Sequence, residues 1–259
     1  MKIWVTGSTG MLGRRVARLA RESGYEVLGT SRWQCPIDEL GIVMRTAQEF
    51  EPDVIINCAG ALPGTPSLEM VTANSLGPHN LAYLKTRLVH MSTDCVYSGR
   101  GIPSDVWLDP EQHAPTPDTL YARSKLAGEP SGDHVLVVRG SFVGPEHGFL
   151  RWLLDSEGKS IDLWAKAWWN GGTATEMARA LVALAQGKKT GVLHVASDQK
   201  FSKASLAHLL VGALKLDLKT TLVREPLLNR ALRPQYVIPG IHTTLPELLQ
   251  EVKACLATA

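Results

Sequence analysis

Two side chains that can exchange protons lie four residues apart near the middle of the sequence. Tyr121 and Lys125 form a Y-x-x-x-K pattern, and on a helix this spacing places both side chains on one face. An ammonium group beside a phenol favours the phenolate and lowers the pKa of the phenol, which suits proton transfer near neutral pH. The pattern therefore predicts an acid–base pair, and the simpler alternative is a solvated helix face.

A run of hydrogen-bonding side chains, Ser92-Thr93-Asp94, comes at the end of the apolar segment 88–92. Ligands of open α/β sheets bind beyond the carboxyl ends of the strands. We therefore expect Thr93 to donate a hydrogen bond to a substrate carbonyl. The alternative is a turn or a helix cap, which these residue types also favour.

Three glycines, Gly7, Gly10 and Gly13, are spaced G-x-x-G-x-x-G between a strand-like and a helix-like segment. Glycine permits a tight turn and the close approach of a pyrophosphate, to which the helix N-terminus presents N–H groups and partial positive charge. The strand before the glycines and the helix after them favour a dinucleotide-binding loop over an ordinary turn.

The end of the second expected strand bears on the choice of cofactor. A carboxylate at this place would hold the 2′-hydroxyl of NAD, but the sequence has Ser31 and Arg32. A guanidinium suits a 2′-phosphate, so the sequence predicts NADPH, with NADH as the alternative cofactor and a surface role as the alternative for Arg32. Asp38, at the end of a short third strand, is expected to bind the adenine amino group or to cap the next helix.

The segments that must position these side chains alternate between apolar strands and helices. Continuous apolar strands separated by helices predict a parallel sheet covered on both faces, that is, an α/β, doubly wound Rossmann fold. We expect an NAD(P)-binding Rossmann domain over residues 1–145. Residues 146–259 should form a small, discontinuous C-terminal substrate lobe, with some segments returning to the Rossmann domain. The expected elements are strands 3–6, 26–31, 54–58, 88–92, 135–139 and 192–196, helices 12–22, 39–50, 68–84 and 245–256, and a long active-site loop, 99–117.

Composition narrows the classes of partner. The 259 residues carry a formal net charge of +2 and show no dense run of Lys or Arg, which argues against a nucleic-acid partner. We find no apolar run of about 18 residues and no leader pattern, so we expect a cytoplasmic protein without a membrane partner. The four cysteines lack C-x-x-C spacing, and we expect no metal site. A monomer and a homodimer both remain open.

These motifs, in this order, resemble the extended short-chain dehydrogenases/reductases and, more narrowly, the dTDP-4-dehydrorhamnose reductase group. The resemblance covers about the first 200 residues and is weaker beyond them. It is carried by GSTGMLG (7–13), PDVIINCAG (52–60), Asn74, STDCVYSG (92–99), PDTLYARSKLAGE (117–129) and VRGSFVGP (138–145).

The resemblance implies NADPH-dependent reduction of a nucleotide-linked 4-keto-6-deoxy sugar, dTDP- or UDP-linked, to the 4-hydroxy sugar. Tyr121 would donate the proton, Lys125 would bind the ribose and tune Tyr121, and Thr93 would orient the keto oxygen. The expected cofactor-binding residues are Gly7, Thr9, Gly10, Met11, Leu12, Ser31, Arg32, Asp38, Cys58, Ala59, Gly60, Asn74, Tyr121 and Lys125. The expected substrate-binding residues are Thr93, Asp94, Phe142 and Arg233.

Two other functions stay open. Cys95 resembles the acid–base cysteine of GDP-fucose synthase, with His147 as a conceivable partner, which would make the protein an epimerase or an epimerase-reductase. A small buried thiol is the simpler interpretation. The protein could also be a catalytically silent NADP-binding regulatory subunit, although the joint presence of Thr93, Tyr121 and Lys125 argues against it.

Several further residues have both a binding and a structural interpretation. An aromatic ring can stack on a nucleobase or a sugar, or pack in a core, and an arginine can bind the substrate pyrophosphate or form a structural ion pair. The residues concerned are Trp164, Trp168, Trp169, Arg139, Arg230 and Arg233.

Overall fold

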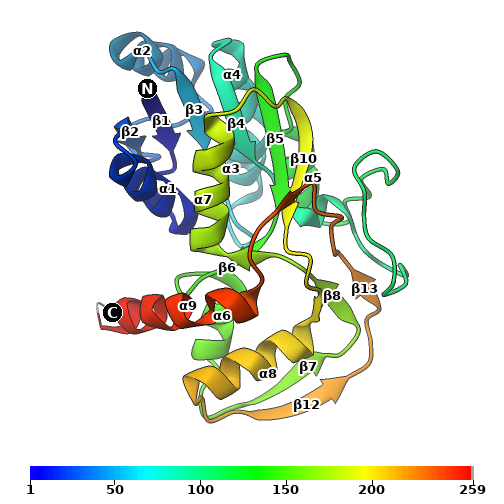
Figure 1. The fold of residues 1–259 in the computed structure, drawn as a ribbon. Coiled ribbons are helices and arrows are strands. Elements are labelled where there is room, and N and C mark those ends of the chain that lie inside the picture. Colours follow the sequence, from blue (N-terminus) through cyan, green and yellow to red (C-terminus); the bar gives the residue numbers. More distant parts are fainter. Residues whose placement is uncertain (258–259) are drawn as a thin grey trace.

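The computed structural model describes residues 1–257 and is built around a seven-stranded sheet (Figure 1). The strand order is β14-β10-β5-β4-β3-β1-β2, and every neighbouring pair is parallel. The predicted α/β fold with a parallel Rossmann-type sheet is confirmed. The strands are β1 (Lys2–Thr6), β2 (Glu26–Thr30), β3 (Val54–Asn57), β4 (Arg87–Met91), β5 (Val135–Gly140), β10 (Gly191–Ala196) and β14 (Tyr236–Val237).

Helices cover both faces of this sheet, which explains why its central strands are apolar throughout. One face packs against α1 (Met11–Glu22) and α7 (Ala174–Ala185). The other face packs against α2 (Leu40–Phe50) and α4 (Gly77–Tyr83). Every residue of β3 and β5 is buried between these layers.

The chain runs from β1 to β2 on one side and then returns to place β3 on the other side of β1. Such a reversal opens a crevice at the carboxyl ends of the two central strands. The register pairs Thr6 with Asn57, so the β1–α1 loop and the segment after β3 leave the sheet side by side.

Two expected elements differ from the structure. The third strand before Asp38 does not form, because the segment 31–39 has few apolar residues, contains a proline and folds back through turn hydrogen bonds to Ser31. The N-cap of α2 is Glu39, so Asp38 does not cap this helix as expected. The single helix expected over 68–84 consists of α3 (Ser67–Val71), a π-helical turn, η1 (Thr72–Leu76), and α4.

The second lobe has its own core, below the sheet in Figure 1. It contains α6 (Gly148–Leu154), α8 (Lys203–Leu214), α9 (Ile241–Leu256), β7 (Ser160–Trp164), β8 (Ala167–Trp169), β11 (Phe201–Ser202), β12 (Lys219–Val223) and β13 (Leu228–Asn229). Between these segments the chain returns to the large sheet as α7, β10 and β14. A short pair, β6 (Phe142–Val143) with β9 (Gly172–Thr173), joins the two lobes.

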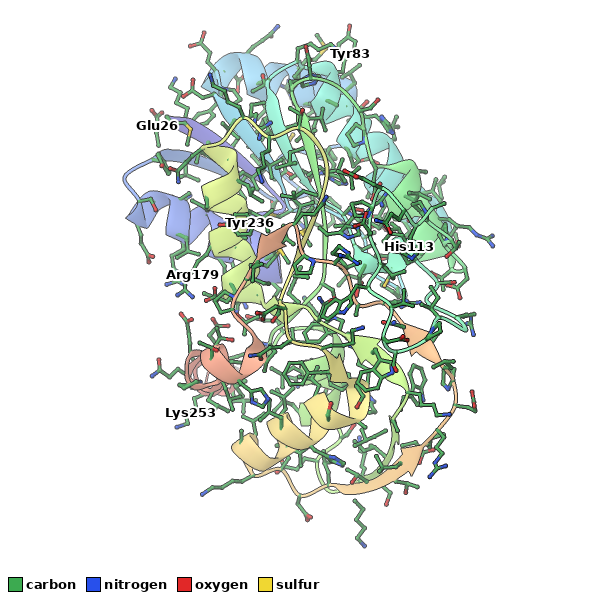
Figure 2. All side chains as sticks on the ribbon, turned by 45° about the vertical axis from the view of Figure 1, so that its right-hand side comes forward. Glu26, Tyr83, His113, Arg179, Tyr236 and Lys253 are labelled. Carbon is green, nitrogen blue, oxygen red and sulfur yellow. The ribbon has the colours of Figure 1, made fainter. Side chains whose placement is uncertain are left out.

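Residues 99–117 form a long connection before α5 (Leu120–Ala127). His113 marks this loop in Figure 2. Isolated bridges tie the loop to the chain near β13, at Arg100 with Leu228 and at Leu108 with Leu232. Over residues 1–257, the structure has no helix with the length and apolar character that a membrane span requires.

Candidate active site

The glycines of the β1–α1 loop are required by close backbone packing. Gly7 has a φ of +66°, and a Cβ atom on it would lie 2.7 Å from the backbone of Ala59. A Cβ atom on Gly13 would lie 2.2 Å from the carbonyl oxygen of Gly7. Gly10 is the N-cap of α1 and supplies no side chain to the first turn. The loop therefore leaves the first N–H groups of α1 facing the crevice beside β3.

A buried chain of hydrogen bonds fixes the opposite wall. Thr6 donates to Asn57 Oδ1 at 2.6 Å, and the same oxygen accepts from the N–H of Ala59 at 3.0 Å. Asn57 Nδ2 in turn donates to His90 Nδ1 at 2.9 Å. Asn57 is thus a positioning residue for the segment 58–60, and it was not among the predicted site residues.

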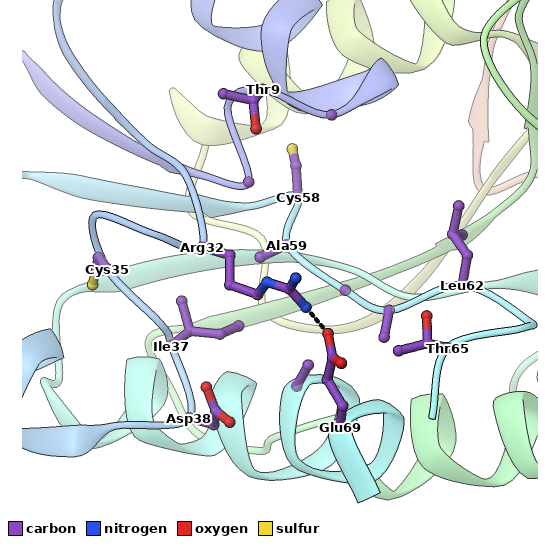
Figure 3. Close-up of a pocket in the computed structure, with 15 residues that line it drawn as sticks. Thr9, Arg32, Cys35, Ile37, Asp38, Cys58, Ala59, Leu62, Thr65 and Glu69 are labelled. Atoms are coloured by element: carbon purple, nitrogen blue, oxygen red, sulfur yellow. Dashed lines mark ion pairs between the residues drawn. The ribbon is translucent and has the colours of Figure 1, made fainter. Parts of the chain in front are cut away.

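Two adjoining cavities, of about 340 and 270 Å³, occupy this crevice. They share Gly10 and the segment 58–62, so they form one continuous cleft. The larger cavity is shown in Figure 3. Predicted residues lining the cleft are Gly7, Thr9, Gly10, Met11, Leu12, Arg32, Asp38, Cys58, Ala59, Gly60, Asn74, Tyr121, Lys125 and Phe142.

One predicted cofactor residue does not line this cleft. The hydroxyl and the N–H of Ser31 both donate to Gln34 Oε1, each at 2.9 Å. Ser31 therefore stabilises the turn after β2, while the neighbouring Arg32 points into the larger cavity (Figure 3).

An ion pair crosses the larger cavity between Arg32 and Glu69 of α3 (Figure 3). Asp38 lines the same cavity. Glu69 was not predicted as a site residue, because it lies in a helix far from the end of β2 in sequence.

Lys125 lies in the smaller cavity with Tyr121, as their spacing on α5 predicts. Its Nζ donates to the carbonyl oxygen of Met91 at 2.8 Å. Burial lowers the pKa of Lys125 to about 8, and the carboxylate of Glu129 partly opposes this effect. Thr119 caps α5 by accepting from the N–H of Ala122 at 3.1 Å, which fixes where the helix begins.

The protonation of Tyr121 differs from the expectation. Burial raises the pKa of its phenol, Cys95 and Asp94 raise it further, and a hydrogen bond with the Thr93 side chain opposes the rise. Lys125 shares the cavity, and its ammonium donates to the carbonyl oxygen of Met91. The phenol therefore keeps its proton at neutral pH and can donate it.

Thr93 is both a cap and a neighbour of the phenol. Its Oγ1 accepts from the N–H of Cys95 at 3.1 Å and donates to Asp94 Oδ1 at 3.3 Å. It begins a short 3₁₀ helix, η2 (Asp94–Val96). The hydroxyl is therefore a helix cap, and the same capping geometry holds it beside Tyr121, as a role at the substrate carbonyl requires.

A third cavity, of about 140 Å³, lies where the second lobe faces the end of β4. Arg230 reaches it and donates to Cys95 Sγ at 3.4 Å. The Nζ of Lys203 lies 4.8 Å from the ring centre of Trp169. The lining residues are Asp94, Cys95, Ser141, Trp164, Ala167, Trp168, Trp169, Lys203, Leu228 and Arg230.

Lys203 was not predicted, because only the folded lobe brings the start of α8 to this cavity. Trp169 is buried and donates to Ser141 Oγ at 2.6 Å, whereas Trp164 is exposed at the cavity. The first therefore packs in a core, and the second is free to contact a ligand.

Two other arginines lie away from the cavities. Arg233 is 58% exposed and pairs with Asp109 at 3.4 Å, and it lines none of the cavities described here for residues 1–257. Arg139 is buried, pairs with Glu129 at 2.7 Å and donates to the hydroxyl of Tyr97 at 2.8 Å. Its role is structural.

Cys95 and His147 line different cavities. Burial raises the pKa of Cys95 to about 11, the Asp94 carboxylate adds to the rise, and Arg230 opposes it. The thiol is therefore neutral near pH 7, and His147, its conceivable partner in an epimerase, lines another cavity.

Comparison with known proteins gives the family. The model of the RmlD substrate binding domain matches residues 1–238. The "probable low-salt glycan biosynthesis reductase Agl14" of Haloferax volcanii is 30% identical, over 76% of this chain and 75% of its own. The "dTDP-4-keto-6-deoxy-D-glucose reductase" of Streptomyces niveus is 27% identical, over 91% of this chain and 87% of its own.

A solved structure agrees with the fold. The dTDP-4-dehydrorhamnose reductase of Bacillus anthracis, crystallised in complex with NADP, superposes with a TM-score of 0.82 at 20% identity. The match covers 96% of this chain and 99% of that one. The chain therefore belongs to the RmlD substrate binding domain family, in agreement with its resemblance to the dTDP-4-dehydrorhamnose reductase group.

Proposed function

We propose that the protein reduces the keto group of a nucleotide-linked 4-keto-6-deoxy sugar, dTDP- or UDP-linked, with NADPH. The observation that carries this proposal is the meeting of Tyr121, Lys125 and the start of α1 in one cavity, beside Thr93 at the end of β4. A dinucleotide loop alone would fit many activities, but a protonated phenol at the cleft fits carbonyl reduction. The names of the Haloferax and Streptomyces relatives, both reductases, support it.

The cleft fits a dinucleotide cofactor. Glycines at positions 7 and 13 keep side chains out of the loop, so the pyrophosphate can approach the N–H groups of α1. Arg32 and Asp38 lie at the end suited to the adenosine, and Lys125 lies at the end suited to the nicotinamide ribose. When bound, the cofactor supplies hydride to the keto carbon.

The chain's own side chains act on the keto oxygen. Tyr121 transfers its phenolic proton to this oxygen as negative charge develops there, and the Thr93 hydroxyl turns from Asp94 to donate a hydrogen bond to the same oxygen. Lys125, which is oriented by its hydrogen bond to the carbonyl oxygen of Met91, binds the ribose hydroxyls. The phenol is protonated at neutral pH, since its pKa lies above the ordinary value for a tyrosine.

The third cavity suits the rest of the substrate. Lys203 and Arg230 bring two cations to it, and Asp94 is the one carboxylate among the described residues that line it. A sugar nucleotide carries a diphosphate, which such cations bind through charge-assisted hydrogen bonds. The exposed Trp164 offers a ring on which a base or a pyranose can stack.

The direct test mixes the protein with NADPH and a panel of dTDP- and UDP-linked 4-keto-6-deoxy sugars, and follows the dihydronicotinamide absorbance. Oxidation with at least one donor is expected. Tight NADPH binding without oxidation by any donor would contradict the proposal and would favour a silent NADP-binding subunit.

A further inference from the structure

The ion pair in the larger cavity determines which adenosine ligand Arg32 can accept. Arg32 is the one cation among the described residues that line this cavity, and its side chain is 57% exposed. Glu69 reaches it from α3, on the opposite wall, and its side chain is 38% exposed. In Figure 3 the carboxylate of Glu69 points at the guanidinium across the cavity.

The backbone around Glu69 is fixed at the wall of the cavity. The N–H of Met70 donates to the carbonyl of Pro66 at 2.9 Å, and the Met70 side chain is buried. The hydroxyl of Thr72 donates to the carbonyl oxygen of Glu69 at 3.3 Å. The main chain of Glu69 therefore stays at the cavity, within reach of Arg32, when Arg32 turns to another anion.

We propose that Glu69 is a specificity-determining residue that competes with the 2′-phosphate for Arg32 and so weakens the preference of the site for NADPH over NADH. This inference rests on the cofactor of the proposed function. A 2′-phosphate carries between one and two negative charges at neutral pH, and to bind Arg32 it must displace Glu69 and then lie beside its carboxylate. Asp38 adds a second carboxylate to the same cavity.

A ligand with a free 2′-hydroxyl does not need to displace Glu69 from Arg32, and it brings no negative charge close to the carboxylate. It can enter while Arg32 and Glu69 stay paired, and a carboxylate is the group that commonly accepts from a ribose 2′-hydroxyl. The wild-type protein should therefore bind both kinds of ligand with similar affinity, although its Arg32 is of the type that selects for a 2′-phosphate.

The test uses the full chain and isothermal titration calorimetry with two small probes, 2′,5′-ADP and 5′-AMP. Replacing the carboxylate by an amide in Glu69→Gln frees Arg32 and removes the repulsion. We expect 2′,5′-ADP to bind about two- to fivefold tighter, as for the loss of a competing exposed ion pair, while 5′-AMP affinity does not rise.

Two variants control this experiment. Glu49→Gln removes the same charge from the exposed face of α2 and should change neither affinity. Arg32→Ala should bring the affinity for 2′,5′-ADP clearly below that for 5′-AMP, because the group that binds the phosphate is gone while the carboxylates of Glu69 and Asp38 remain.

The outcomes separate this inference from the proposed function. Unchanged or weaker binding of 2′,5′-ADP to Glu69→Gln, with both probes binding the wild type, would overturn the role of Glu69 alone. Failure of the wild type to bind either probe would remove the cofactor site, and the proposed function and this inference would both fall.

Discussion

The protonation of Tyr121 is set by its surroundings more than by its neighbour in the Y-x-x-x-K pattern. The spacing correctly places Tyr121 and Lys125 in one cavity. Burial then raises the pKa of the phenol, and Lys125 is directed at the carbonyl of Met91 instead. The spacing determines that the two side chains lie on one face of the helix. It does not determine how deeply they are buried or where the ammonium group points.

The residues that the sequence did not reveal have a common cause. Glu69 and Lys203 reach the cavities only through contacts between segments far apart in the chain. Asn57 lies within the motif 52–60, but its positioning role depends on hydrogen bonds with Thr6 and His90, which sequence does not show. Of the three arginines considered for the substrate pyrophosphate, Arg230 lines the third cavity, and its N–H donates to the carbonyl of Trp168 of β8 at 3.1 Å. The motifs therefore predicted most residues that line the cleft, whereas Glu69 and Lys203 are supplied by tertiary packing.

Cys95 is expected to be dispensable for reduction. Its raised pKa keeps the thiol neutral, and thiol acid–base chemistry requires a lowered pKa or a base. Cys95→Ser, which keeps an acceptor for Arg230, should retain turnover within about threefold, a loss well short of that for removing an acid–base group. A reaction in deuterated water should place no deuterium on the carbons beside the carbonyl. Incorporation that Cys95→Ser abolishes would instead establish an epimerase.

Lys203 is expected to bind the substrate. Lys203→Met keeps much of the side-chain volume and removes the charge from the third cavity, so KM for the sugar nucleotide should rise about tenfold or more. The affinity for NADPH should not change. Lys253→Met serves as the control, because this side chain lies on the outer face of α9 (Figure 2). An equal effect of both substitutions on KM would rule out a specific role for Lys203.

At the scale of elements, the β1–α1 turn should tolerate no side chain at Gly13. Gly13→Ala would force a Cβ atom to within 2.2 Å of the Gly7 carbonyl oxygen, and we expect a loss of about 1–3 kcal/mol in the free energy of unfolding, together with weaker NADPH binding. Urea denaturation and calorimetry measure both.

Gly41→Ala is the matched control for that change. Gly41 lies in α2 with open space around it, so alanine there should stabilise the protein by about 0.5–1 kcal/mol. If Gly13→Ala were as stable as the control, the tight packing of this turn would be contradicted.

Most of the elements could be predicted because their signals are local. The apolar segments 54–58 and 135–139 appear as the buried strands β3 and β5. The expected third strand was wrong, because the turn hydrogen bonds to Ser31 outweigh a weak strand pattern in 31–39. The π-helical turn η1 was also not foreseen, since its sequence reads like the helices on either side of it.

At the scale of the whole molecule, a buried histidine makes folding sensitive to acid. His194 of β10 contacts the carbonyl of Leu108 and the hydroxyl of Tyr97, each at 3.1 Å, so it joins the sheet to the long loop. Burial and Arg139 lower its pKa to about 4 from 6.5. As the pH falls, the unfolded chain takes up this proton first, so stability is lost from about pH 6.5 down through about pH 4.

The variant His194→Gln tests this coupling. Between about pH 7.5 and pH 5, the wild type should lose about 2 kcal/mol more of its unfolding free energy than the variant does. Urea denaturation at the two pH values measures the difference. Equal losses in the two proteins would show that His194 does not control the acid sensitivity.

The proton donor is the central claim, and Tyr121→Phe tests it most directly. Turnover of a keto-sugar substrate with NADPH should fall about 10²-fold or more when the phenolic proton is removed, while calorimetry finds the affinity for NADPH unchanged. A variant that binds NADPH and reduces the substrate at the wild-type rate would contradict the assignment of Tyr121.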